Sequence, residues 1–199
     1  MKGQIMLKTI LLCGAGVATL GVVTVFALAS QKPATFHIER STVIAAPPEA
    51  VFTHLNDFRR WAAWSPWEKL DPSMQKTYGG PPSGVGATYA WRGNGKAGEG
   101  QMTILESRPG EHLLLRLEFL KPFPATNTAT YTLMPKPEGT AITWAMDGEN
   151  TTMGKVFAVF FDMDALVGKD FERGLADLKA VSEAAGALPS VAPTSTATP

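Results

Sequence analysis

Histidines and carboxylates are the side chains of this sequence that can act as acids, bases or metal ligands. The three histidines, His37, His54 and His112, are far apart and form no H-x-x-x-H or H-E-x-x-H pattern, so the sequence predicts no metal site. His54 follows Pro48 on a segment with helical spacing, where a histidine can serve as an acid or base near neutral pH. A partly exposed, structural His54 is the competing interpretation.

Six carboxylates are candidates for a polar position in an apolar cavity, where burial raises the pKa of a lone carboxyl group. They are Asp71, Glu99, Glu118, Glu149, Asp162 and Asp164. Their spacing predicts no convergent pair. Strand alternation places Arg116 and Glu118 opposite Leu115 and Leu117, which favours a solvated outer ladder of charges. In the reverse register, the same two charges would anchor the head group of a ligand.

A glycine-rich stretch over residues 93–98 (GNGKAG) matches the G-x-G-x-x-G pattern of dinucleotide-binding loops. Such a site needs a helix directly after the glycines, whereas residues 99–105 alternate as a strand. We therefore interpret Asn94-Gly95 as a hairpin turn with positive φ and predict no cofactor. Cys13 is the single cysteine, which excludes an intramolecular disulfide and a Cys-based zinc site.

Charge and length limit the partners and the number of domains. The 199 residues hold 18 Lys+Arg against 18 Asp+Glu, and beyond Lys2 and Lys8 the chain holds 16 basic and 18 acidic residues. This balance disfavours a nucleic-acid-binding surface. The length allows one ordinary domain with an attached segment and excludes a TIM barrel.

An uncharged apolar segment covers residues 9–30. As a helix at about 1.5 Å per residue it extends about 33 Å, which matches a hydrocarbon core of roughly 30 Å. We predict a transmembrane anchor within residues 1–31, with the N-terminus cytoplasmic and the domain on the periplasmic side, because Lys2 and Lys8 precede the segment. A cleavable signal peptide and a secreted mature form are the alternative, since residues 27–29 (ALA) fit a small-x-small cleavage site.

The remaining chain divides into a domain over residues 35–185 and a disordered tail over residues 186–199, which is dominated by Pro, Ser, Thr and Ala. Within the domain, residues 36–45 alternate as a strand and residues 49–55 have helical spacing. Asn56-Asp57 can cap a second helical piece that ends before Pro66. Loop residues follow as far as Gly86.

A run of alternating segments comes next and predicts an antiparallel meander. Its strands include residues 89–91, 102–105, 113–119, 128–134 and 140–146. Apolar residues then recur at three- and four-residue steps from Met163 through Leu178, which predicts a long helix that begins near Lys155 or Met163 and ends near Ala185. This order of elements is typical of an α+β domain in which a curved antiparallel β-sheet wraps around a long C-terminal α-helix.

Large apolar side chains gather on these inner elements, and they suit either a packed core or the wall of an apolar cavity. As a cavity, the site would be lined by Trp64, Trp67, Tyr89, Trp91, Leu115, Leu117, Phe119, Tyr131, Trp144, Phe157, Phe161 and Phe171. Asp162 and Asp164 interrupt the apolar segment over residues 156–167. That segment is either a lid or membrane-facing element carried by its phenylalanines, or a connector capped by aspartate before the last helix.

Three stretches resemble the START-related SRPBCC superfamily, and in particular its small bacterial polyketide cyclase/dehydrase and lipid-transport proteins, many of which carry an N-terminal membrane span. The stretches are residues 45–52 (AAPPEAVF), 55–67 (LNDFRRWAAWSPW) and 168–179 (GKDFERGLADLK). The resemblance covers residues 35–183. It implies a helix-grip fold with a hydrophobic cavity between the sheet and the C-terminal helix.

The resemblance also implies a ligand class of lipids, sterols or polyketides, and some members are cyclases or hydrolases. It carries no family-wide catalytic residue set onto this sequence. We expect membrane-anchored binding or transport of a hydrophobic small molecule, a lipid or lipid-like metabolite. A cyclase- or hydrolase-type enzyme that uses His54 or a cavity carboxylate as its base is the alternative, and a scaffold with a filled core is the third.

Overall fold

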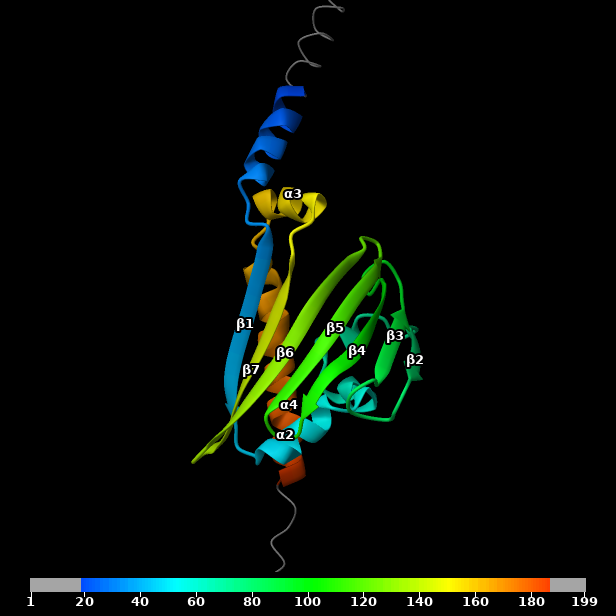
Figure 1. Cartoon of the computed structure of the whole chain (residues 1–199), viewed down its shortest axis with the longest axis vertical. Coiled ribbons are helices and arrows are strands. Elements are labelled where there is room, and N and C mark those ends of the chain that lie inside the picture. Colours follow the sequence, from blue (N-terminus) through cyan, green and yellow to red (C-terminus); the bar gives the residue numbers. More distant parts are fainter. Residues whose placement is uncertain (1–18, 187–199) are drawn as a thin grey trace, which may run out of the picture.

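The computed structural model describes residues 19–186, with a helix over residues 19–30 ahead of the domain (Figure 1). The elements that follow are β1 (Thr35–Ile44), α2 (Pro48–Leu55), η1 (Phe58–Ala63), η2 (Pro66–Lys69), β2 (Gln75–Gly79), β3 (Thr88–Arg92), β4 (Glu99–Arg108), β5 (His112–Lys121), β6 (Ala125–Lys136), β7 (Gly139–Glu149), α3 (Thr152–Phe160) and α4 (Met163–Gly186). The predicted α+β class, with an antiparallel sheet and a long final helix, is confirmed.

The strands form one seven-stranded sheet in the order β1-β7-β6-β5-β4-β3-β2, in which every neighbouring pair is antiparallel. Strands β2 to β7 are consecutive neighbours, as a meander requires, and β1 closes the other edge against β7. Figure 1 shows the sheet curving in front of α4. The edge strand β2 lies in a region for which the sequence predicts only loop.

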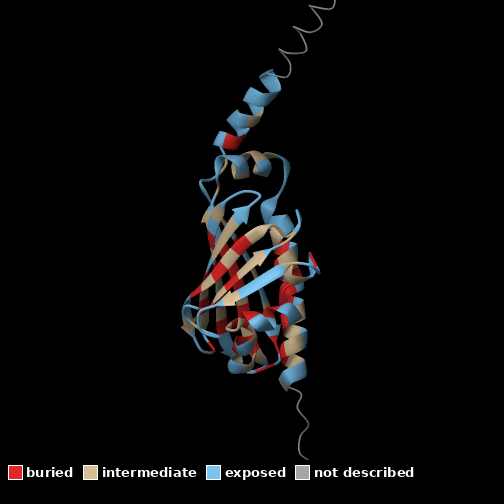
Figure 2. Cartoon of the chain, turned by 90° about the vertical axis from the view of Figure 1, so that its right-hand side faces the viewer, coloured by how far each residue is buried: buried red, intermediate tan, exposed pale blue. Residues whose placement is uncertain are grey.

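The long helix α4 packs on the inner face of the sheet. Its apolar stripe of Phe171, Leu175 and Leu178 is fully buried, because residues spaced by three and four positions share one helix face. Figure 2 shows the buried positions concentrated on this face and on the facing strands. Asp162 caps the helix by accepting the Ala165 amide at 3.1 Å, which confirms the capped-connector interpretation of that residue.

An ion pair holds the start of α4 against β1. The Arg40 guanidinium bonds to the carboxylates of Asp164 and Glu172, at 2.9 Å in each case. The Asp164 pKa is lowered by this contact, since the cation stabilises the ionised carboxyl group. Asp164 therefore has a structural role at the edge of the sheet.

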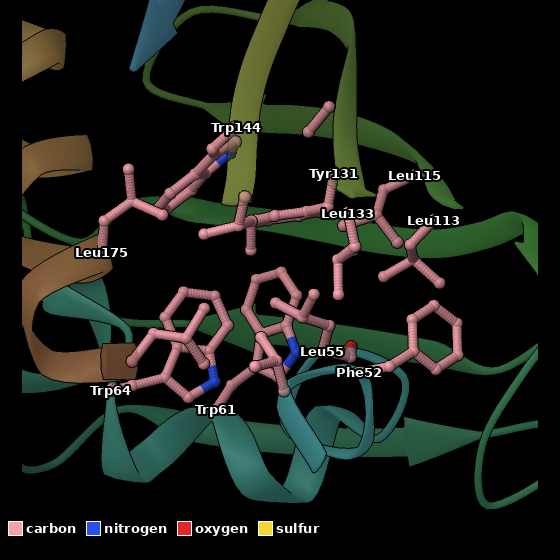
Figure 3. Close-up of a cluster of buried hydrophobic side chains, with 14 of the residues drawn as sticks. Phe52, Leu55, Trp61, Trp64, Leu113, Leu115, Tyr131, Leu133, Trp144 and Leu175 are labelled. Atoms are coloured by element: carbon pink, nitrogen blue, oxygen red, sulfur yellow. Dashed lines mark hydrogen bonds between the residues drawn. The ribbon is translucent and has the colours of Figure 1, made fainter. Parts of the chain in front are cut away.

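The short helices α2, η1 and η2 cover the inner face of the sheet beside α4 (Figure 3). Asp57 caps η1 through the Arg59 amide, as predicted from the sequence. Two indole N–H groups tie η1 back to α2: Trp61 donates to the Leu55 carbonyl at 2.9 Å, and the Trp64 indole donates to the His54 carbonyl at 3.1 Å. These bonds place a layer of aromatic rings against the sheet.

The turn between β3 and β4 differs in detail from the sequence-based interpretation. Asn94 accepts the Lys96 amide at 2.8 Å through its side chain, and positive φ occurs at Gly98 (66°) rather than at Gly95. The turn is longer than a two-residue hairpin, so the left-handed position moves to its last residue. Asp71 accepts the Asn94 amide at 2.7 Å and anchors the turn to the loop before β2.

The two ends of the chain fall partly outside the described residues. Of the predicted span over residues 9–30, only residues 19–30 are described, and they are helical. Between residues 19 and 186, no helix combines the length and the apolar character needed to cross a bilayer. The predicted tail over residues 186–199 lies almost entirely beyond the described chain.

Gly174 lets α4 approach the sheet closely. A β-carbon at this position would lie 2.8 Å from Cζ3 of Trp144 and 3.1 Å from Cδ of Pro66. We expect Gly174→Ala to lower the free energy of unfolding, because an overpacking cost of about 1–3 kcal/mol exceeds the gain of about 1 kcal/mol in helix propensity. Urea denaturation followed by circular dichroism measures this difference.

Gly154 on α3 is the matched control. A β-carbon there would meet only the Thr151 hydroxyl at 3.4 Å and the Asn150 side chain at 3.8 Å, both of which are ordinary contacts. Gly154→Ala should therefore leave stability unchanged or raise it by up to about 1 kcal/mol. An equal loss of stability in both variants would contradict the close approach of α4 to Trp144.

Candidate functional site

A pocket of about 390 Å³ lies between the inner face of the sheet, the η1–η2 segment and the first half of α4. Its wall comes from sequence segments that are far apart, and aliphatic and aromatic side chains form most of it. The lining residues are Trp61, Ser65, Trp67, Glu68, Leu70, Met74, Tyr89, Trp91, Lys96, Ala97, Met102, Leu115, Leu117, Phe119, Ala129, Tyr131, Trp144, Met146, Val167, Asp170 and Phe171. Its volume falls in the range of small-molecule sites, roughly 300–1,000 Å³.

Most of the residues named from the sequence meet at this pocket. Nine of the twelve predicted lining residues are in its wall. They are Trp67, Tyr89, Trp91, Leu115, Leu117, Phe119, Tyr131, Trp144 and Phe171. On β5 the agreement follows from strand alternation, because Leu115, Leu117 and Phe119 project from the same face of the strand.

The other three predicted residues lie elsewhere. Trp64 is fully buried in the core, where its ring contacts those of Trp61 and Trp144. Phe157 and Phe161 belong to α3 and its C-terminal end, are 44% and 50% exposed, and stack on each other with centroids 4.4 Å apart. Because α3 ends at Phe160 and a new helix begins at Met163, these rings do not follow α4 onto the sheet.

Aromatic rings form two walls of the pocket. Tyr89 and Trp91 stack on β3 with ring centroids 6.0 Å apart. On the opposite side, Trp144 and Phe171 stack at 4.1 Å with an angle of 7° between their planes. The two stacked pairs present flat apolar surfaces to the pocket.

Glu68 supplies a carboxylate to this apolar wall, and it was not among the sequence candidates. Its side chain is 6% exposed, forms an ion pair with Lys76 and accepts the Tyr89 hydroxyl at 2.6 Å. Burial, together with the hydrogen bond to Glu68, raises the Tyr89 pKa well above its usual value, so the phenol stays protonated. None of the six carboxylates considered from the sequence is in the pocket wall.

Two residues of the wall each carry a hydrogen-bond donor that is enclosed in the core. The Tyr131 hydroxyl and the Trp144 indole N–H are buried, and neither has a hydrogen-bond partner within residues 19–186. Burial raises the Tyr131 pKa well above its usual value, so the hydroxyl keeps its proton. An unsatisfied buried donor costs about 1–3 kcal/mol, which makes this pair an uncommon feature of a folded core.

Two further charged residues line the pocket. Lys96 is exposed on the β3–β4 turn, and Asp170 on α4 pairs with Arg173 at 3.3 Å.

The Arg116 guanidinium lies 3.2 Å from the Glu118 carboxylate, and neither residue is in the pocket wall. The outer-ladder interpretation of those two residues is therefore confirmed.

His54 lies outside the pocket wall. Its ring is half-buried on α2, and its Nδ1 has no hydrogen-bond partner within the described chain. Burial, with a smaller contribution from Arg60, lowers the His54 pKa below 6.5. The geometry favours the structural interpretation of this histidine.

His54 makes stability depend on pH. Since its pKa is lower in the folded than in the unfolded state, the unfolded chain binds the proton first, and stability falls as the pH drops below about 6.5. Below pH 6.5, the free energy of unfolding of His54→Gln should therefore fall less steeply with decreasing pH than that of the unsubstituted protein. The difference between the two slopes is at most about 1.4 kcal/mol per pH unit. Urea denaturation of both proteins between pH 8 and pH 5 measures the slope.

His37 provides a control of opposite sign. Its hydrogen bond to Asp147, at 2.7 Å, raises the His37 pKa, so this contact stabilises the fold below pH 6.5 and is lost as the pH rises through the folded-state pKa. In His37→Gln the loss of stability should therefore be larger at pH 5 than at pH 8. The same pH trend in both variants would contradict the burial of His54.

A second depression, of about 910 Å³, is wide and open. It lies at the ends of β1, β6 and β7, and Thr126, Thr128 and Asp147 are among its polar lining residues. Since small-molecule sites are enclosed and mostly apolar, the pocket between the sheet and α4 is the stronger candidate for a ligand site.

Comparisons with known proteins agree with this geometry. A family model described as "Polyketide cyclase / dehydrase and lipid transport" matches residues 35–183. That match includes every strand, α2, and almost all of α4. A search of the curated proteins finds no match to this sequence.

Solved structures share the fold at low sequence identity. Protein CV1439 from Chromobacterium violaceum is 20% identical, with a TM-score of 0.54 over 76% of this chain and 99% of that one. The Aha1 dimer from Colwellia psychrerythraea is 16% identical, with a TM-score of 0.53 over 74% and 96%. The di-domain ARO/CYC StfQ from the steffimycin biosynthetic pathway is 12% identical, with a TM-score of 0.57, and the match covers 77% of this chain and 52% of StfQ.

Proposed function

Since the chain belongs to the polyketide cyclase/dehydrase and lipid transport family, we propose that it binds and carries a hydrophobic small molecule, a lipid or lipid-like metabolite, in the pocket between the sheet and α4. The observation that carries the proposal is the apolar wall of this pocket, with a volume of about 390 Å³. Burial of apolar ligand surface contributes about 25 cal/mol per Å², so an elongated hydrocarbon chain gains affinity along its whole length. The few polar groups then set its orientation.

Native mass spectrometry of the full chain tests this proposal. The protein would be extracted into an amphipol polymer, which is too large to enter the pocket, and transferred under mild conditions. A co-purifying aliphatic species, or saturable binding of a fluorescent fatty-acid probe, is the expected result. A mass that corresponds to the bare chain, together with no saturable probe binding, would overturn the proposal.

We also propose that the protein is anchored in a membrane through residues 9–30. The uncharged apolar character of this segment supports the proposal. Helix α3 also supports it. None of its residues is buried, and in both Figure 1 and Figure 2 it lies at the same end of the domain as residues 19–30. Retention of the full-length chain in membranes after a carbonate wash is expected, and a soluble chain that begins near residue 31 would show cleavage instead.

A cyclase- or hydrolase-type enzyme is the second candidate, and Glu68 is the observation that favours it. A carboxylate held in an apolar wall beside a protonated tyrosine has the chemistry of a general base, which contributes about 10²–10⁴-fold to a rate. Hydrolysis of 4-nitrophenyl octanoate that falls at least 100-fold in Glu68→Gln, with unchanged probe binding, would support the enzyme. Equal background rates in both proteins would exclude Glu68 as the base for this ester.

A further inference from the structure

Helix α3 exposes an apolar face. Met153, Phe157 and Phe160 follow one another at four- and three-residue steps, so they share one side of the helix, and all three are exposed. Lys155 is the one charged residue between Thr152 and Phe160. Since large apolar patches on a protein surface mark contact with a partner or a membrane, this face calls for an occupant.

The exposed phenylalanines of the domain gather at the same end as α3. Among residues 35–186 they are Phe123, Phe157, Phe160 and Phe161. Phe123 lies on the turn between β5 and β6, close to the exposed Leu120. Because β5 ends and β6 begins where β1 begins and β7 ends, this turn and α3 lie at one end of the sheet (Figure 1). Two separate segments therefore expose aromatic rings at this end.

Hydrogen bonds hold the start of α3 beside the chain that enters the domain. The Asn150 amide donates to the Ala34 carbonyl at 2.8 Å, and the Asn150 side chain donates to the Pro33 carbonyl at 3.1 Å. Pro33 follows the apolar segment over residues 9–30 by three residues, a length of chain that extends at most about 10 Å. Since α3 begins two residues after Asn150, its first turn lies close to the end of that segment.

We propose that α3 lies in the surface of the lipid bilayer that residues 9–30 enter, with the rings of Phe157 and Phe160 among the lipid chains. Phe123 contacts the same surface from the β5–β6 turn. An interfacial helix buries its apolar face about 5–10 Å deep, and the short link through Pro33 permits this depth. The inference rests on the proposed anchor and adds a second membrane contact, which orients the domain.

This contact brings the pocket close to the membrane. Leu70 and Lys96 are the exposed residues among those that line the pocket, so the pocket reaches the surface beside them. Lys96 lies on the β3–β4 turn, which shares an end of the sheet with the β5–β6 turn, because β4 begins opposite the end of β5. Asp71, next to Leu70, bonds to the Asn94 amide of the β3–β4 turn. A hydrophobic ligand then has a short path between the bilayer and the pocket.

Quenching by lipid-borne nitroxides tests the contact in the full chain. A fluorescent label is attached to α3 through Met153→Cys in a Cys13→Ala background, and the protein is reconstituted into phosphatidylcholine vesicles with or without doxyl-labelled phosphatidylcholine. The label should lose most of its fluorescence in the doxyl vesicles. A label at Met134→Cys is the matched control and should keep its fluorescence, because Met134 is as exposed as Met153 but lies on β6 at the opposite end of the sheet.

Phe157→Ser combined with Phe160→Ser tests whether the two rings make the contact. Both side chains are exposed, so the fold should persist, while the Met153 label recovers most of its fluorescence. Affinity for the fatty-acid probe should be unchanged, since neither ring is in the pocket wall, and uptake of the probe from the bilayer should slow severalfold. Val85→Ser combined with Met134→Ser removes exposed apolar side chains elsewhere and should change neither readout.

The outcomes separate this contact from the proposals on which it rests. Quenching at Met153 that the double serine variant removes, with slower uptake, establishes the contact and the path to the pocket. A Met153 label that stays bright in a chain retained after the carbonate wash overturns the contact and leaves the anchor standing, and so does quenching that survives in the serine variant. Cross-linking between two Met153→Cys copies without quenching assigns this face to a second copy instead.

Two further results complete the test. Unchanged uptake in a serine variant that has lost the quenching overturns the path to the pocket. A chain that the carbonate wash releases overturns the anchor and the contact together. Saturable binding of the probe is measured separately, so the proposed ligand binding stands or falls independently of α3.

Discussion

Replacement of Trp64 by alanine is expected to lower the free energy of unfolding by about 3–5 kcal/mol, the range for a fully buried tryptophan. The Trp64 ring is 0% exposed and lies edge-on to the rings of Tyr131 and Trp144, with centroids 6.2 Å and 5.7 Å away. Its indole N–H also ties η1 to α2 through the His54 carbonyl. The substitution removes packing from both layers at once.

Trp67→Ala is the comparison for this prediction. Trp67 is half-buried at the pocket and contacts Trp144 and Phe171 edge-on at 5.4 Å and 6.1 Å. Its removal enlarges an existing pocket, so a smaller loss of stability is expected than for Trp64. Urea denaturation measures both variants. A loss below about 1 kcal/mol for Trp64→Ala would contradict its place at the centre of the core.

The sequence predicts the inner elements well because their burial follows a simple period. Alternation identifies the inner face of β5, and the three- and four-residue spacing identifies the buried stripe of α4. The sequence does not predict strand β2, because Gln75–Gly79 is short and mostly exposed, lies at the edge of the sheet and shows no apolar alternation. The sequence marks the break between α3 and α4 through the capping Asp162, but it does not show that Thr152–Phe160 forms a helix of its own.

The site is only partly predictable for a different reason. Trp64 and Trp67 are three residues apart and chemically identical, yet one fills the core and the other faces the pocket. That distinction depends on the spacing between layers, which long-range packing sets. Glu68 follows Trp67 on the four-residue turn η2, too short to reveal which side chain points inward. Its partner Lys76 lies on the unpredicted strand β2.

A larger side chain at Leu117 is expected to abolish ligand binding without unfolding the protein. Leu117 is half-buried and lines the pocket, so the added volume of Leu117→Trp enters open space and should cost less than about 1 kcal/mol of stability. The indole would occupy room that a ligand chain needs. Affinity for the fluorescent fatty-acid probe should therefore fall at least about tenfold, a loss of about 1.4 kcal/mol in binding free energy.

Leu113→Trp is the matched control on the same strand. Leu113 projects from the same face of β5 as Leu117, but it is 0% exposed and lies outside the pocket wall, in the closed part of the core. Overpacking there should cost about 1–3 kcal/mol of stability. A folded Leu113→Trp protein should still bind the probe, since its pocket is intact. Equal destabilisation by the two substitutions would mean that the space beside Leu117 is packed like that beside Leu113, and the scaffold with a filled core would then be the better account of this fold.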